Sequence, residues 1–152
     1  MPEHVALMRA WQSGDPARVD AQFRRLLRYL TISMPAFDDI ARTLDDPAAA
    51  RAVLARAYGD AAYQDPTRMM FIAWHAAHFG DDGLAGAALR RALVDLNGTF
   101  VPAIWFPDLA RYRKTPEFKQ LARDLRLYEY WRASGNWGDH CRPIGADDFE
   151  CD

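Results

Sequence analysis

The sequence has no strong excess of charge of either sign and no long apolar run. Its 152 residues carry a formal net charge of -2, and half of them are apolar. Because no large basic field is present to hold a phosphate backbone, we expect no nucleic-acid partner. No stretch approaches the ~18 apolar residues of a membrane span, and the first residues lack the positively charged start of a signal peptide. We therefore expect no membrane insertion and a cytoplasmic protein.

Cysteine and lysine are both scarce. Cys141 and Cys151 are the only cysteines and stand ten positions apart. In a reducing compartment two thiols are more often free than bridged, so we expect free thiols, with a disulfide as the less favoured alternative. Lys114 and Lys119 are the only lysines, whereas arginine and alanine are abundant, which hints at a GC-rich bacterial genome.

Four short motifs predict helix starts. In each, an Asp or Thr at the N-cap accepts a hydrogen bond from the first turn, and the proline that follows needs no donor. Apolar residues then recur at helical spacing, as Phe118, Leu121 and Leu125 do, whereas the alternation typical of strands is missing. We therefore predict an all-α protein without strands. The motifs are Gly14-Asp15-Pro16, Asp45-Asp46-Pro47, Gln64-Asp65-Pro66 and Lys114-Thr115-Pro116. The predicted helices are 3–13, 16–32, 35–44, 47–62, 66–79, 82–96 and 116–133, with irregular structure over 100–114.

The segment from Pro66 to Gly98 has the most regular pair of helices. Small residues stand where the helices must approach, Gly80 lies near the turn, and larger apolar residues fill between. This pattern resembles one tetratricopeptide (TPR) repeat. Because one hairpin cannot bury its apolar face alone, the resemblance implies antiparallel hairpins stacked as a short TPR-like superhelix. The small residues are Ala73, Ala85 and Ala92; the larger ones are Ile72, Leu89 and Leu93; and Met69, Ala76 and Asn97 replace the Trp, Tyr and Pro of the family.

The following segment resembles the C-terminal TPR segment of bacterial regulatory proteins, and the whole resemblance covers about residues 66–152. An R-x-x-P-x-F run, a leucine-bearing helix and a Y-W-x-x-x-G-x-W-x-D-x-C ending carry it. These elements are Arg113, Pro116 and Phe118; Leu121, Leu125 and Leu127; and Tyr130, Trp131, Gly135, Trp137, Asp139 and Cys141. The resemblance implies a short repeat protein, free-standing or part of a longer one.

We predict a single domain with four parts. Degenerate helical hairpins occupy 1–65, the best TPR-like unit 66–98, a linker and terminal helix 99–135, and a capping tail 136–152. Repeat arrays need protected ends. We therefore expect Trp131, Trp137 and Cys141 to close the end of the helical stack.

The resemblance also implies a groove that takes a protein or peptide partner. The residues that the family turns toward its groove fall at Thr67, Met70, Trp74, Ala77 and His78. Trp74 would be the anchor, because an aromatic side chain supplies a large contact area at low entropic cost. Burial of Trp74 against the preceding hairpin is the alternative. We predict a non-catalytic interaction module that needs no cofactor.

Two other functions stay open. His140, Cys141 and Cys151 offer zinc ligands, so a small metal-binding protein or metal-dependent hydrolase is one alternative, although paired close ligands are missing. His75 and His78 share a helix face without the Glu of a zinc-protease motif. Self-association through exposed helix faces, giving a homo-oligomer, is the other alternative. No nucleophile motif or phosphate loop is present, so we predict no enzyme.

Overall fold

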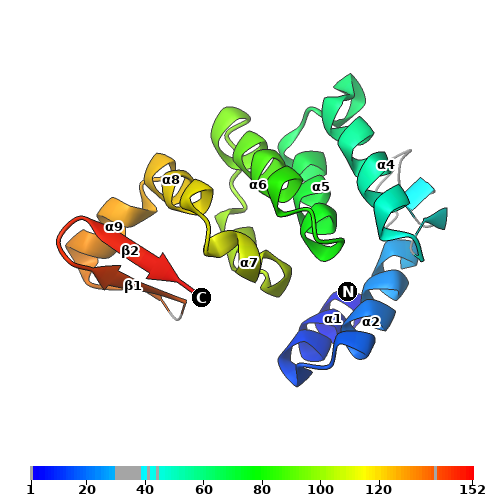
Figure 1. The fold of residues 1–152 in the computed structure, drawn as a ribbon, viewed down its shortest axis with the longest axis horizontal. Helices are drawn as coiled ribbons and strands as arrows, with labels where there is room; N and C mark the ends of the chain where they lie inside the picture. The colour runs from blue at the N-terminus through cyan, green and yellow to red at the C-terminus, as the bar shows by residue number, and fades with distance from the viewer. Residues whose placement is uncertain (1, 30–38, 41, 44, 139) are drawn as a thin grey trace. The chain divides into compact units, whose positions relative to one another are not determined.

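The computed structural model describes every residue except 1, 30–38, 41, 44 and 139 (Figure 1). It consists of two compact units, residues 1–53 and 54–152, and each is described by itself. The described residues are mostly helical, which agrees with the predicted class. The stacking of hairpins into a TPR-like superhelix and the single domain stay predictions. Among these residues no helix is both long and apolar enough to cross a membrane.

The first unit contains a hairpin of α1 (Pro2–Ser13) and α2 (Pro16–Tyr29). Gly14 makes the turn with a φ of +66°, a conformation that glycine adopts at no steric cost. Leu7 and Ala10 are buried in this unit. The predicted helix 35–44 lies largely outside the described residues.

All four predicted N-caps are confirmed. The carboxylates of Asp15, Asp46 and Asp65 each accept a hydrogen bond of 3.0 Å from an amide of the first turn. The Thr115 hydroxyl does the same at 3.2 Å. Asp81 adds a further cap of 2.9 Å. Local side-chain chemistry therefore sets where these helices begin.

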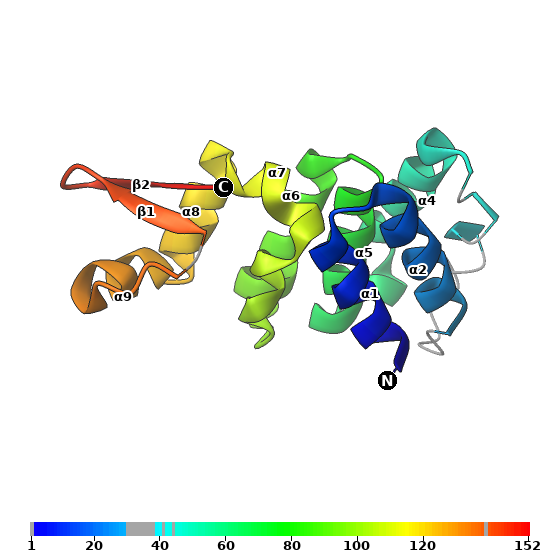
Figure 2. The same ribbon diagram turned by 90° about the horizontal axis from the view of Figure 1, so that it is seen from below.

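The predicted hairpin of the second unit is present. After α4 (Pro47–Gly59) and the short η1 (Ala61–Tyr63), α5 (Pro66–His78) lies beside α6 (Asp82–Arg90), as Figures 1 and 2 show. A π-helical turn, η2 (Arg91–Asp95), continues α6. The small residues Ala73, Ala85 and Ala92 expose no surface. The identity of the hairpin as a TPR unit stays a prediction.

The rest of the helical chain is more broken than predicted. The irregular stretch contains η3 (Val101–Trp105), η4 (Pro107–Leu109) and α7 (Ala110–Arg113). The predicted helix 116–133 is wrong as one element, because it divides into α8 (Pro116–Asp124) and α9 (Leu127–Ser134).

A left-handed residue causes this division. Arg126 has a φ of +60°, and its amide donates to the Arg123 carbonyl oxygen at 2.8 Å, which closes α8 with a tight turn. No glycine or proline marks this break in the sequence, so the apolar pattern predicted one continuous helix. The break turns the chain so that Trp131 of α9 joins the aromatic residues of the C-terminal segment.

The tail forms a β-hairpin, which corrects the prediction that the chain has no strands. Strand β1 (Cys141–Ile144) pairs antiparallel with β2 (Asp148–Cys151). Gly145 starts the connecting turn with a φ of +57°. A hairpin this short is marginal in isolation, so contacts with the helices must support it.

The register explains how a proline fits into this hairpin. The Asp152 amide donates to the His140 carbonyl oxygen at 2.9 Å, which makes these two residues a hydrogen-bonded pair. Alternate pairs of an antiparallel ladder are not hydrogen-bonded, so Pro143, opposite Phe149, needs no amide proton.

Candidate functional site

The predicted anchor Trp74 is covered by the chain itself. Its side chain is 7% exposed, its ring lies 5.4 Å from that of Phe106 between centroids, and its Nε1 donates to Asp108 Oδ2 at 3.1 Å. The covering residues belong to the segment that follows the hairpin. Phe106 and η4 therefore cover this face of α5, and Trp74 is buried, as the alternative expected, with the following segment among the residues that cover it.

The five predicted groove residues do not form one open surface. Thr67 is exposed, Met70 and His78 are half-buried, and Trp74 and Ala77 are buried. Sequence reasoning missed the cover because it lies some thirty positions downstream, in a segment without regular periodicity.

Asp108 fastens the covering segment to α5. The same Oδ2 that accepts from Trp74 lies 3.6 Å from Nδ1 of His78, whose charge depends on its protonation. Arg111 adds a second link, because its Nη2 donates to the Ala77 carbonyl oxygen at 3.0 Å. These contacts hold two segments of one chain together.

His75 and His78 have different surroundings. His75 is buried, and its Nδ1 lies 2.5 Å from the carbonyl oxygen of Phe71, to which it donates. Burial lowers the pKa of His75 to about 4, against the opposing effect of that hydrogen bond. The ring is therefore neutral at pH 7, and its role is structural. In the described part of the chain, no three His, Cys, Asp or Glu side chains gather as a metal cluster.

An open groove lies between α6 and α8. It has a volume of about 560 Å³ and is lined on one side by successive turns of α6. Gly86, Ala87, Tyr112 and Leu121 form its apolar part, and Asp82, Gly83, Arg90, Thr115, Glu117 and Gln120 complete the lining.

Gly86 and Tyr112 shape the groove. A Cβ on Gly86 would lie 2.4 Å from a carbon of the Tyr112 ring, so only glycine allows α7 to approach α6 this closely. Burial is the main reason that the pKa of Tyr112 rises to about 12. The phenol is therefore neutral, and the floor of the groove carries no charge.

Most charges at the groove are paired within the chain. Arg111 holds Asp82 through Nε at 3.0 Å, and Arg90 pairs with Asp124, whose pKa this contact lowers. Among the described residues, the Glu117 side chain takes part in no hydrogen bond or ion pair. Glu117 lies exposed in the first turn of α8, where the helix dipole favours its negative charge.

Two of the three predicted capping residues, Trp131 and Trp137, lie in one aromatic cluster. The ring of Trp131 lies 5.8 Å from Trp137 and 5.5 Å from Phe149, and Tyr128 stacks on Phe149 at 5.6 Å. Phe149 has no exposed surface and sits at the centre of the cluster. Cys141, the third capping residue, lies on the strand opposite. Sequence reasoning missed Phe149, because an acidic tail gave no apolar periodicity.

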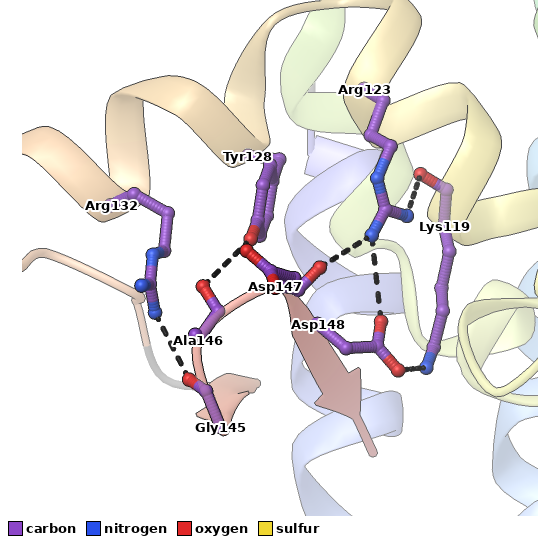
Figure 3. Close-up of polar contacts among 8 residues, drawn as sticks. All are labelled: Lys119, Arg123, Tyr128, Arg132, Gly145, Ala146, Asp147 and Asp148. Carbon is purple, nitrogen blue, oxygen red and sulfur yellow. Dashed lines mark hydrogen bonds and ion pairs between the residues drawn. The ribbon is translucent and has the colours of Figure 1, made fainter.

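Side chains of α8 and α9 hold the hairpin turn (Figure 3). Lys119 Nζ donates to Asp148 Oδ2 at 2.6 Å, and Arg123 Nη2 donates to the Asp147 carbonyl oxygen at 3.2 Å. Farther along α9, Arg132 donates to the Gly145 carbonyl oxygen at 3.3 Å. Lys119, one of only two lysines, thus stabilises the hairpin turn. Its hydrogen bond lowers the pKa of Asp148.

Cys141 and Cys151 are joined by a disulfide, which contradicts the expectation of free thiols. The two residues face each other in the ladder, at a position where side chains approach most closely. Both sulfurs are therefore used, so the alternative metal site with His140 has no thiolate ligand in this state. The His140 ring instead stacks on Trp105, with centroids 5.8 Å apart.

Comparison with protein-family models, with curated proteins and with solved structures gives no match to this chain.

Proposed function

We propose that this protein is a non-catalytic interaction module that binds a peptide segment of another protein in the groove between α6 and α8. The observation that carries the proposal is the groove itself: about 560 Å³ of open space over an apolar floor with a polar rim. Apolar pockets rimmed by a few polar groups are typical of binding sites.

The small residues on α6 suit a peptide rather than a bulky ligand. Gly83 and Ala87 are exposed and lie one turn apart on the same face. Because neither has a long side chain, a ligand backbone approaches the helix closely along its length. We infer a segment with apolar side chains that fill the space over Leu121.

Charge adds a preference for the partner. Asp82 and Arg90 are already paired within the chain, so they contribute polarity without excess charge. The Glu117 carboxylate supplies the remaining charge of the lining. A positively charged group on the partner would complement it. The partner segment that fits best therefore carries a basic residue near this carboxylate.

Selection from a random peptide library on the full chain tests the proposal. The selected peptides are then measured on Ala87→Trp, which fills the groove, and on Ala133→Trp, which places the same residue on an exposed position of α9 outside the groove. We expect Ala87→Trp to weaken binding about tenfold or more, equivalent to 1.4 kcal/mol. Equal binding to both variants contradicts the proposal.

The TPR-like assignment and the bacterial origin belong to the same proposal, and the cytoplasmic location is a separate expectation. The disulfide argues against the last of these, because such bonds persist in oxidising compartments. A thiol-trapping gel of the native protein, taken directly from its cells, decides between a reducing and an oxidising compartment. A fully trapped dithiol supports the cytoplasm, and an untrapped disulfide excludes a reducing compartment.

A further inference from the structure

A second pocket, of about 370 Å³, lies where η3, α9 and the loop after α9 meet. Its lining residues are Trp105, Tyr130, Trp131, Asn136, Gly138 and His140. No Asp, Glu, Lys or Arg is among them. The described wall is therefore aromatic and uncharged at neutral pH apart from any charge on His140.

The aromatic rings stand at different angles around this pocket. Trp105 lies 6.0 Å from Trp131 at an interplanar angle of 42°, and His140 stacks on Trp105 at 24°. Tyr130 is 57% exposed, one of the most exposed large apolar side chains of the described residues. Rings inclined in this way offer several faces to a compact apolar group.

The pocket offers several hydrogen-bond donors from its side chains. Among the described residues, neither indole N–H of Trp105 and Trp131 nor the Tyr130 hydroxyl forms a hydrogen bond, and neither indole nitrogen is cut off from solvent. Asn136 Oδ1 already accepts from the Gly138 amide at 3.3 Å, which leaves the Asn136 amide N–H groups as further donors. Acceptors on a ligand would therefore find several donors in this pocket.

We infer that this pocket binds a proline residue of an extended peptide. Proline has no amide proton, so its burial here leaves no donor unsatisfied, and the flanking carbonyl oxygens accept from the indole and amide N–H groups. The pyrrolidine ring packs against aromatic faces, as it does in other aromatic-lined grooves that take polyproline II segments.

Other ligand classes fit this wall less well. An anionic ligand would find no fixed counter-charge on it. A quaternary ammonium ion uses none of the hydrogen-bond donors. The inference goes beyond the groove between α6 and α8, because the two pockets share no lining residue.

Fluorescence anisotropy with fluorescein-labelled octaproline tests the inference on the full chain. We expect saturable binding that weakens about fivefold or more in Tyr130→Ala, as for an aromatic contact at an interface. Because Tyr130 is largely exposed, this variant keeps its fold. Phe100→Ala is the matched control: Phe100 is 54% exposed and does not line the pocket, so binding stays unchanged. Asn136→Ala, which removes donors without removing a ring, also weakens binding.

Each of three binding results would overturn the inference, as would displacement in the competition described after them. Octaproline fails to bind, or it binds the Tyr130→Ala protein as well as the wild type, or a glycine-serine peptide of equal length binds as tightly. Competition with tetramethylammonium and with a soluble oligosaccharide completes the test, since displacement of octaproline by either assigns the pocket to that class instead. A failure here leaves the library selection on the other groove unaffected.

Discussion

The Nε of Arg113 donates a hydrogen bond of 2.9 Å to the main-chain oxygen of Asp152, 39 positions along the chain. Its Nη1 donates to the carbonyl oxygens of Ile104 and Phe106 at 3.1 and 3.0 Å. One buried guanidinium thus joins η3, Phe106 directly before η4, and Asp152 directly after β2. Burial lowers the pKa of Arg113, against the attraction of Asp152.

Replacement of this guanidinium should destabilise the second unit. We expect Arg113→Met to lower the free energy of unfolding by about 3 kcal/mol, because it leaves three carbonyl oxygens without their donor. Urea unfolding measures the change. Arg56→Met removes an exposed arginine from α4 and should change stability by no more than about 0.5 kcal/mol. Equal stability of the two variants would show that the Arg113 contacts contribute nothing.

Two glycines of α6 should respond in opposite directions to the same methyl group. Gly86→Ala forces a Cβ to within 2.4 Å of the Tyr112 ring and should cost about 1–3 kcal/mol. Gly83→Ala meets only Asp81 Oδ1, at 3.6 Å, and should stabilise the helix by up to about 1 kcal/mol. Thermal unfolding of both variants checks the order. A Gly86→Ala protein at least as stable as Gly83→Ala contradicts the close packing of α6 on α7.

The disulfide should contribute strongly to a hairpin of this size. Closing the chain between Cys141 and Cys151 restricts the unfolded state, and we expect the double change to serine to cost about 3 kcal/mol. Reductant should destabilise the wild type by a similar amount and leave the double variant unchanged. If reductant leaves the stability of the wild type unchanged, the disulfide does not stabilise the protein.

Acid should destabilise the protein through His75. Its pKa is about 4 in the folded chain and 6.5 ordinarily, so between these values the unfolded chain binds a proton that the folded chain excludes. The contribution of His75 is therefore complete above pH 6.5 and declines as the pH falls toward 4, by up to about 3 kcal/mol. Urea unfolding at pH 7 and 4.5 should show a smaller difference for His75→Gln than for the wild type. An equal difference would assign the acid sensitivity to other groups.

Features that depend on residues close together in the sequence could be predicted from it. Features that depend on contacts between distant residues could not. Asp65 and Thr115 cap helices that begin at the next residue, so short sequence motifs were enough to predict their roles. The cover over Trp74 comes from Asp108, 34 positions away. No periodicity reports such a contact.

The hairpin shows the same limit. Its pairing joins two short strands, one of which contains Pro143, and its turn depends on Lys119 and Arg123 of a distant helix. Neither strand carries the alternation that predicts one. The ending that resembles the TPR proteins contains Trp131 and Cys141, but nothing in it predicts that Phe149 of β2 packs against Trp131.

Backbone amide chemical shifts of the isotope-labelled chain, titrated with a library-selected peptide, test the central claim most directly. We predict that the largest changes fall on Gly83, Gly86, Ala87 and Gln120, which line the groove between α6 and α8. Changes concentrated away from these positions, with the α6 and α8 amides unmoved, would contradict the groove as the binding surface.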